Sequence, residues 1–217
     1  NSDGYWGASV NLASVYDFNG DGKDDLIFTN PDYYCIADGP SGALLLGPAF
    51  PPDIFKQPSQ GLYTLPALLA GEGAEPLVAL TSGHYFQGVM DLAATPRWHA
   101  LPQPGAARCG SEGFLRIGTG EWLLGYGRQD GRFVCVDLAT GAPYAQLDVQ
   151  ATVSDVVTLD VDGDGQQEFL FGTSHGELIA VAPESGNLAV RWRFSTDTGL
   201  GTPMPADLDG DAIVEIV

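Results

Sequence analysis

Three acidic segments of the chain carry oxygen-bearing side chains at alternate positions, a spacing that suits the binding of a hard cation. In the segment that begins at Asp160, acidic side chains stand at positions 1, 3, 5 and 9, and glycines stand at positions 4 and 6. Calcium takes six to eight oxygen ligands, and alternate residues of a tight turn can supply several of them. We therefore expect a calcium site whose ligands are Asp160, Asp162, Asp164, the Gln166 carbonyl and Glu168.

The same ligand spacing occurs at residues 17–25, with Asn19 at position 3, and at residues 207–215, with Ala212 in place of the glycine at position 6. It differs from the EF-hand calcium loop, which needs a bidentate Glu at position 12 and flanking helices. Position 12 is Phe28 in one copy and Phe171 in another, and the flanking residues are strand-like. The alternative interpretation is a set of solvated hairpin turns without metal, because Asp-Gly is a strong hairpin signal. Three copies of one ligand pattern favour the cation sites.

The acidic segments belong to an internal repeat. Short apolar runs follow Glu121, Glu168 and Glu215 at or near the same point, and these glutamates are about 47 residues apart, a period typical of propellers and solenoids. We interpret the chain as one partial domain of sequential units, which span residues 8–60, 61–108, 109–151, 152–200 and, incompletely, 201–217.

Each unit has the pattern of four short strands. The sequence predicts the strands of the fourth unit at residues 155–159, 168–172, 177–181 and 188–194. Short, regularly spaced strands without helical periodicity indicate an all-β radial or barrel-like fold. We therefore expect a β-propeller of four-stranded antiparallel blades, with about four and a half blades present. Because a ring needs whole blades, we expect these residues to belong to a longer propeller that further domains or chains complete.

Two units lack the acidic loop. The second has Gly71-Glu72-Gly73 in its place, with Leu68 and Ala70 at the first two ligand positions, and the third shortens the loop to Gly118-Thr119-Gly120. Neither unit offers enough oxygen ligands on side chains, so we expect no calcium there.

Composition excludes some classes of partner. The chain has 9 Lys and Arg against 28 Asp and Glu, for a formal net charge of −19, so we expect no nucleic-acid surface. No apolar run reaches the roughly 20 residues of a membrane helix, so we expect no membrane insertion. The chain starts at Asn1 without a basic and apolar leader, which suits a processed, exported protein or a fragment. We expect an extracellular, cell-surface or periplasmic location.

The three cysteines are too few and too irregularly spaced for a metal cluster or a disulfide framework. Cys109 and Cys135 either form a disulfide between neighbouring strands or are two buried free thiols. The sequence leaves both alternatives open.

The acidic loops, with the apolar residues that follow, resemble the D-x-[DN]-G-D-G-x-x-[DE] motif of FG-GAP and VCBS repeats. These repeats form the calcium-binding β-propeller of integrin α subunits and of many exported bacterial proteins. The resemblance implies calcium in two or three of the loops, each between the first and second strands of a blade. It implies the ligands Asp17, Asn19, Asp21, the Lys23 carbonyl and Asp25, and the ligands Asp207, Asp209, Asp211, the Ile213 carbonyl and Glu215.

Two further segments, residues 182–192 and 136–141, resemble the blade-closing motif of quinoprotein-type propellers. That resemblance implies that Trp192 packs between blades, and it does not imply a quinone cofactor. The expected calcium is structural, because five protein donors leave little room for substrate, whereas a catalytic metal keeps an open position.

The sequence shows little sign of catalysis. His84 and His99 lie in the second unit and His175 lies in the fourth, without a nucleophile motif nearby, so we assign no catalytic residue and no cofactor besides calcium. We expect a binding module that recognises a protein or a glycan, in adhesion or surface assembly. The alternative is a propeller-fold enzyme, such as a polysaccharide lyase or a quinoprotein-like oxidoreductase. The scarcity of Lys and Arg argues mildly against the lyase, which needs a basic group near an acidic sugar.

Overall fold

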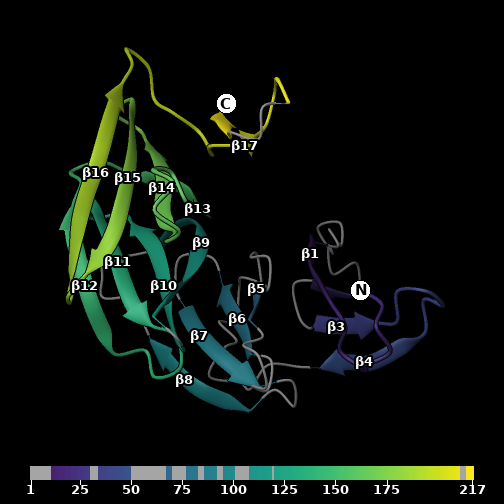
Figure 1. The fold of residues 1–217 in the computed structure, drawn as a ribbon. Helices are drawn as coiled ribbons and strands as arrows, with labels where there is room; N and C mark the ends of the chain where they lie inside the picture. Colours follow the sequence, from purple (N-terminus) through teal and green to yellow (C-terminus); the bar gives the residue numbers. More distant parts are fainter. Residues whose placement is uncertain are drawn as a thin grey trace, which may run out of the picture. The chain divides into compact units, whose positions relative to one another are not determined.

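The computed structural model describes residues 11–29, 34–49, 67–69, 77–82, 86–91, 95–100, 108–118, 120–210 and 214–217. All regular structure in this part of the chain is β-strand, arranged in antiparallel sheets whose strands follow one another in chain order (Figure 1). Within these ranges no helix has the length and apolar composition of a membrane span. The chain divides into two compact units, Asn1–Leu101 and Pro102–Val217.

The first unit contains two four-stranded sheets, which we call sheets 1 and 2. The strands of sheet 1 are β1 (Asn11–Tyr16), β2 (Asp25–Thr29), β3 (Tyr34–Ala37) and β4 (Leu44–Ala49). The strands of sheet 2 are β5 (Ala67–Leu69), β6 (Leu77–Ser82), β7 (Phe86–Asp91) and β8 (Pro96–Ala100).

The second unit contains two four-stranded sheets and one strand pair, which we call sheets 3, 4 and 5. The strands of sheet 3 are β9 (Arg108–Ile117), β10 (Glu121–Arg128), β11 (Arg132–Asp137) and β12 (Pro143–Asp148). The strands of sheet 4 are β13 (Val153–Leu159), β14 (Glu168–Thr173), β15 (Glu177–Glu184) and β16 (Asn187–Ser195). Sheet 5 pairs β17 (Pro205–Ala206) with β18 (Glu215–Ile216).

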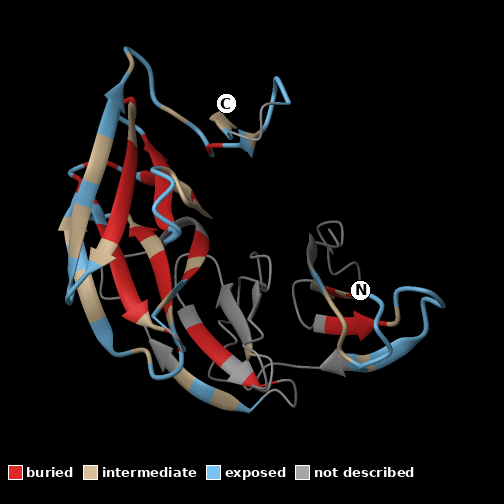
Figure 2. Cartoon of the chain, viewed as in Figure 1, coloured by how far each residue is buried: buried red, intermediate tan, exposed pale blue. Residues whose placement is uncertain are grey.

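The middle strands of sheet 4 are buried and its last strand is exposed (Figure 2). Every residue of β14 is buried, whereas β16 has no buried residue. A continuous apolar run such as Phe169-Leu170-Phe171 is typical of a strand covered on both faces. The fourth strand of the sheet therefore forms the outer edge, and the second strand lies in the packed interior.

The core of the second unit lies between sheets 3 and 4 and contains residues from both. The ring of Phe133 on β11 stacks on Phe171 of β14, with 4.6 Å between centroids, and lies 5.3 Å from the ring of Phe169. Gly125 of β10 faces these rings, and a Cβ at this position would lie 2.6 Å from Phe133 Cζ. The absence of a side chain at Gly125 thus lets the aromatic rings of two sheets meet.

A β-bulge recurs in the fourth strand of each four-stranded sheet. In sheet 4, Ala180 pairs with Trp192 while the next residue, Val181, pairs with Val190, which leaves Arg191 as the extra residue. The registers of the other three sheets shift at the same place. The extra residue is therefore Leu45 in sheet 1, Arg97 in sheet 2, Tyr144 in sheet 3 and Arg191 in sheet 4. Bulges re-aim a side chain, and these four positions are structurally equivalent.

The predicted all-β class with four-stranded antiparallel sheets is confirmed. Each strand predicted in residues 152–200 lies inside an observed strand of sheet 4. The division of the chain into a single domain of five units stays a prediction. Cys135 is a buried free thiol, so it does not pair with Cys109. The two residues lie on β9 and β11, which flank β10 on opposite sides.

Candidate functional site

Each acidic loop connects the first and second strands of its sheet. In sheet 4 the loop starts after β13, and its last candidate ligand, Glu168, is the first residue of β14. Asp25 opens β2 and Glu215 opens β18 in the same way. The second strand therefore fixes the ninth position of the loop. The glycines at positions 4 and 6 adopt positive φ angles that bend the chain back, as Gly163 (φ 76°) and Gly165 (φ 85°) do, and glycine adopts such angles without steric cost.

In sheet 4 the main chain of the loop organises the carboxylates. Asp160 accepts hydrogen bonds from the N–H groups of Gly163 (2.7 Å) and Gly165 (2.9 Å). The Asp164 carboxylate accepts one from Gln166 (2.8 Å). Glu168 Oε2 accepts one from Val161 (3.0 Å), which ties the end of the loop to its start. These bonds hold the carboxylates in place before any cation binds.

Sheet 1 repeats this arrangement. Asp17 accepts hydrogen bonds from Gly20 (2.7 Å) and Gly22 (2.8 Å), and Asp25 Oδ2 accepts one from Phe18 (3.0 Å). Asp25 is fully buried, and its second oxygen accepts a hydrogen bond from the N–H of Gly39 at 3.1 Å. The remaining candidates of this loop, Asn19, Asp21 and Lys23, are exposed; Asn19 accepts a bond from the Asp21 N–H and Asp21 one from the Lys23 N–H, each at 2.9 Å.

The loop of sheet 5 shows two of the same bonds. Asp207 accepts from Gly210 (2.6 Å), and Glu215 Oε2 accepts from Leu208 (2.7 Å). Asp207, Asp209 and Glu215 place carboxylate oxygens within 4.8 Å of one another. The predicted ligands Asp211 and Ile213 lie outside the described residues.

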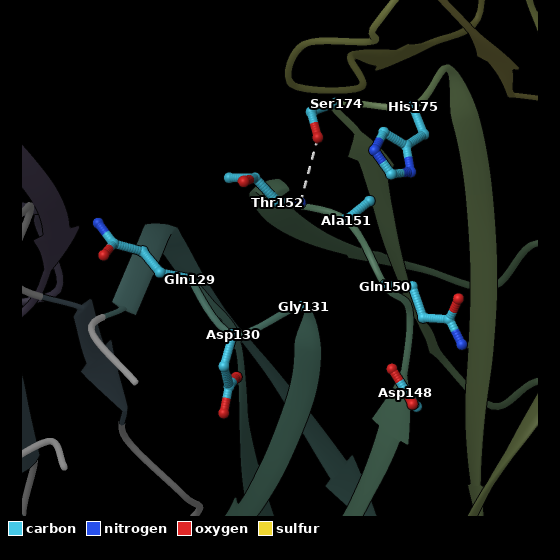
Figure 3. A pocket seen from close by; sticks show the side chains of 9 residues that line it. All are labelled: Gln129, Asp130, Gly131, Asp148, Gln150, Ala151, Thr152, Ser174 and His175. Carbon is cyan, nitrogen blue, oxygen red and sulfur yellow. Dashed lines mark hydrogen bonds between the residues drawn. The ribbon is translucent and has the colours of Figure 1, made fainter. Parts of the chain in front are cut away.

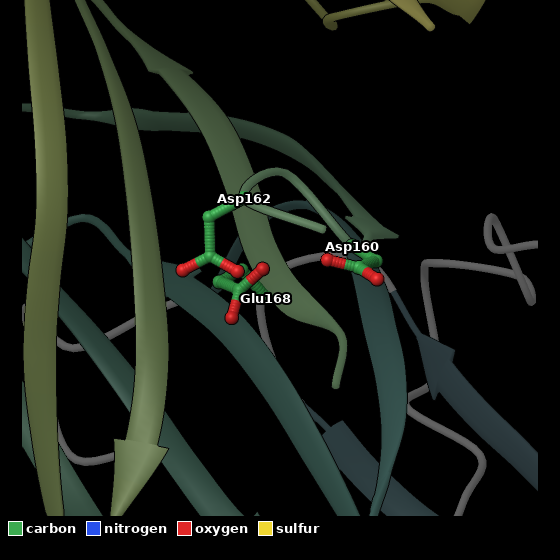
Figure 4. A group of neighbouring side chains, drawn as sticks. All are labelled: Asp160, Asp162 and Glu168. Atoms are coloured by element: carbon green, nitrogen blue, oxygen red, sulfur yellow. The ribbon is translucent and has the colours of Figure 1, made fainter. Parts of the chain in front are cut away.

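Asp160, Asp162 and Glu168 form the corresponding cluster in sheet 4, again with oxygens within 4.8 Å of one another (Figure 4). Glu168 is fully buried, and its Oε1 has no hydrogen-bond partner. Burial raises the pKa of this carboxyl, the Val161 N–H lowers it, and the neighbouring Asp162 raises it further. A buried carboxylate oxygen without a hydrogen bond is costly, so the site is suited to a bound cation.

The space beside Glu168 also fits such a role. A hollow of about 80 Å³ is lined in part by Glu168, Gln166 and Arg191, and the share of liquid volume of one water molecule is about 30 Å³. The donor set is all oxygen, which suits calcium or magnesium rather than a soft transition metal. The residues of sheet 4 therefore fit the predicted calcium, with Asp160, Asp162 and Glu168 gathered and Asp164 beside them.

Sequence reasoning missed one residue at this site, Arg191. Its Nε lies 3.5 Å from Asp162 Oδ2 and 3.7 Å from Glu168 Oε1. Arg191 follows the loop by more than twenty residues, and only the pairing of β14, β15 and β16 brings it to the carboxylates. No local motif marks this contact in the sequence. The only sequence signal is the repeat period, since Arg191 stands 47 residues after Tyr144, within the range of propeller repeats.

The opposite ends of sheets 3 and 4 form a second, polar hollow of about 520 Å³ (Figure 3). The N–H groups of Val149 and Gln150 both donate to the Gly131 carbonyl at 2.8 Å, which holds Gln150 at a left-handed φ of 58°. The Thr152 N–H donates to Ser174 Oγ at 3.2 Å. The lining residues are Gln129, Asp130, Gly131, Asp148, Gln150, Ala151, Thr152, Ser174 and His175.

This hollow is open to solvent, main-chain hydrogen bonds order its edge, and its lining carries amide, hydroxyl, carboxylate and imidazole groups. His175 lies on its rim and is exposed. The other two histidines, His84 and the side chain of His99, lie outside the described part of the structure. The arrangement offers hydrogen-bond donors and acceptors, the kind of group that fixes the orientation of a polar ligand.

Comparison with known proteins identifies the fold. The FG-GAP repeat family matches residues 10–46, which contain the acidic loop of sheet 1. No curated protein matches the sequence. Among solved structures, Saccharomyces cerevisiae Sqt1 has a TM-score of 0.67 at 9% identity, covering 94% of this chain and 53% of that one.

Two other solved structures are similar in fold. BBS1N in complex with ARL6DN has a TM-score of 0.66 at 8% identity, covering 91% of this chain and 57% of that one. The Neurospora crassa Pan2 WD40 domain has a TM-score of 0.57 at 13% identity, covering 94% and 60%. The chain thus spans between 53% and 60% of the length of these structures.

WD40 repeats form β-propellers whose blades are four-stranded sheets. The chain has four-stranded sheets of the same kind, and we conclude that it has the fold of part of a β-propeller. Its residues 10–46 match the FG-GAP repeat family, which confirms the resemblance for the acidic loop of sheet 1.

Proposed function

We propose that this chain is part of a calcium-stabilised β-propeller that acts as an interaction module outside the cytoplasm. The observation that carries the calcium proposal is the buried Glu168 carboxylate, whose Oε1 has no hydrogen-bond partner and which shares a cluster with Asp160 and Asp162. The hydrogen bonds that recur in sheets 1, 4 and 5 support the same role for their loops.

The residues that would hold calcium are those of the three loops. In sheet 4 they are Asp160, Asp162, Asp164, the Gln166 carbonyl and Glu168, and the corresponding sets begin at Asp17 and Asp207. A bound calcium ion would supply positive charge to carboxylates that otherwise repel one another. The loops join the first two strands of each sheet, so ordering them stabilises the strand pair on which the sheet is built.

We propose an exported location because the acidic loops resemble those of FG-GAP repeats in exported proteins. The side chains of Asp162 and Asp164 are exposed and leave one side of the cluster open to solvent. If the loops bind calcium with the dissociation constants of extracellular modules, about 10⁻⁴ to 10⁻³ M, only a calcium-rich compartment would saturate them. The proposed compartment is the cell surface, the periplasm or the medium.

The proposed interaction surface is the polar hollow at the other end of sheets 3 and 4. It offers exposed hydrogen-bonding groups from Asp148, Gln150 and His175 on a frame fixed by main-chain hydrogen bonds. Such groups suit a protein or glycan ligand. One structure of similar fold is described as a complex with a protein partner, which supports protein recognition by this architecture in general.

Calorimetry with and without calcium tests the first part of the proposal. We expect the melting temperature to fall when a chelator removes calcium, and to recover when calcium, but not an equal concentration of sodium chloride, is returned. Asp162→Ala should reduce the calcium-dependent part of the shift. Equal melting temperatures in calcium and chelator would refute the calcium role.

A binding screen tests the second part. Soluble protein and glycan arrays probed with the intact chain should give ligands whose binding weakens in Gln150→Ala. A change at Gln146, which is exposed on β12 and does not line the hollow, is the matched control. Equal binding by both variants would place the ligand elsewhere.

A further inference from the structure

Arg191 lies against the acidic loop of its own sheet. Its Nε is 3.5 Å from Asp162 Oδ2, and its Nη2 is 3.8 Å from Asp164 Oδ2. Its Nη1 donates a hydrogen bond of 2.6 Å to Glu184 Oε1 on the far side. The guanidinium is therefore anchored by Glu184 and presents its charge to the carboxylates that we propose as calcium ligands.

The contact with Glu168 is one of charge rather than hydrogen bonding. Arg191 Nε and Glu168 Oε1 lie 3.7 Å apart, and both atoms are buried without a hydrogen-bond partner. A hydrogen bond between nitrogen and oxygen needs a separation near 2.9 Å. The two atoms thus face each other across a small gap, within the hollow of about 80 Å³ that they help to line.

Sheet 1 provides an internal comparison, because its loop has the same main-chain hydrogen bonds. It carries Asn19 where sheet 4 carries Asp162, and the bulge residue equivalent to Arg191 is Leu45. Its buried carboxylate, Asp25, accepts main-chain hydrogen bonds on both oxygens. At these two positions sheet 1 therefore has neither a carboxylate nor a guanidinium. Its Asn19 instead donates a hydrogen bond of 3.3 Å to Asp38, and Lys23 is a cation within the loop itself.

The two exchanges compensate each other. Sheet 4 has four candidate carboxylate ligands and one guanidinium, and sheet 1 has three candidate carboxylate ligands and an aliphatic bulge residue. The side chains at these positions thus carry the same net charge, whereas Glu184 beside Arg191 and Lys23 and Asp38 in sheet 1 lie outside this comparison. A cationic side chain within about 4 to 6 Å of a carboxylate lowers the affinity of that carboxylate for a proton by about tenfold or more, and the same repulsion acts on a metal cation.

We propose that Arg191 is a built-in counter-charge that determines how strongly the loop of sheet 4 binds calcium. When no metal is bound, the guanidinium offsets the repulsion among Asp162, Asp164 and Glu168 and so keeps these carboxylates close together. When calcium binds, the guanidinium and the ion compete for the same oxygens, so the affinity is lower than the four carboxylates alone would give. This inference rests on the proposed calcium function.

A reciprocal exchange between the two sheets tests the proposal. Arg191→Leu installs the residue of sheet 1, and Leu45→Arg, at a position that is 43% exposed, installs the residue of sheet 4. We expect calcium titration calorimetry to show about tenfold tighter binding at one site in Arg191→Leu. Leu45→Arg should weaken binding at one site to a similar extent. Unchanged dissociation constants in both variants would overturn the proposal.

Melting in chelator separates the counter-charge from simple packing. We expect Arg191→Leu to melt at a lower temperature than the parent protein in chelator, and the added change Asp162→Asn to restore part of the loss. A loss that Asp162→Asn does not restore would show that Arg191 acts only by packing and would refute the proposal. If Arg191→Leu does not fold, Arg191→Gln with and without Asp162→Asn gives the same comparison, because glutamine is polar but uncharged.

The melting temperatures of these variants in chelator also distinguish the counter-charge role of Arg191 from the proposed calcium function. A parent protein that binds no calcium refutes the proposed calcium function and the affinity role of Arg191. The coupling between Asp162 and Arg191 in chelator would still be measured, and its absence would refute the counter-charge itself.

Discussion

Replacing Glu168 with Gln should affect stability in opposite directions with and without calcium. The side chain is fully buried. Burial raises the pKa of the carboxyl and the Val161 N–H lowers it, while Asp162 adds to the rise, so the charged form is disfavoured in the absence of a cation. The carbonyl oxygen of Gln can keep the hydrogen bond from the Val161 N–H. The metal-free protein should therefore become more stable when the charge is removed.

With calcium present the same change should be destabilising. A site that is saturated at one hundred times its dissociation constant adds about 2.7 kcal/mol to the free energy of unfolding. Glu168→Gln removes a charged ligand and should abolish most of this contribution. For a chain of this size, such a loss corresponds to a fall in melting temperature of about 5 to 10 °C.

Asp25→Asn is the matched control. Asp25 accepts main-chain hydrogen bonds on both oxygens, from Phe18 and Gly39, and Asn has only one side-chain oxygen. One buried N–H would lose its acceptor, at a cost of about 1 to 3 kcal/mol. This variant should therefore be less stable than the parent in chelator as well as in calcium.

Differential scanning calorimetry of the parent and both variants, in chelator and in excess calcium, gives the four differences needed. The reasoning fails if Glu168→Gln lowers the melting temperature by the same amount in both conditions. That result would mean that the carboxylate acts through contacts that do not involve a cation.

Two other predictions concern the interior of the second unit. Burial raises the pKa of the Cys135 thiol from 9.0 to about 12. The folded protein therefore has its full stability below pH 9 and loses up to about 1.4 kcal/mol of it per pH unit as the pH rises toward 12. Cys135→Ala should flatten that part of a curve of unfolding free energy against pH, and an unchanged curve would contradict the prediction. A Cβ at Gly127 would lie 2.3 Å from Val153 Cβ, whereas one at Gly120 meets nothing within 4 Å; urea unfolding should show a loss of about 1 to 3 kcal/mol for Gly127→Ala and little change for Gly120→Ala, and equal losses would refute the packing argument.

Much of the fold could be predicted from local patterns. The strands of sheet 4 are short apolar or alternating runs separated by glycine-containing turns, and neighbouring residues alone determine such patterns. The acidic loops could also be predicted from the sequence, because the candidate ligands of each loop come from nine consecutive residues. The spacing of Asp160, Asp162 and Glu168 therefore indicates a cation site wherever the loop lies in the molecule.

The sequence by itself thus determined the strand repeat, the all-β class and the positions of the acidic loops, since each depends on spacing over a few residues. Only the tertiary structure showed that Glu168 is buried with an unsatisfied oxygen, because β14 is covered by strands distant in the sequence. Only the pairing of β14, β15 and β16 brings Arg191 to Asp162. Burial and charge contacts depend on chain segments that meet only after folding, so the spacing of residues along the sequence does not predict these contacts.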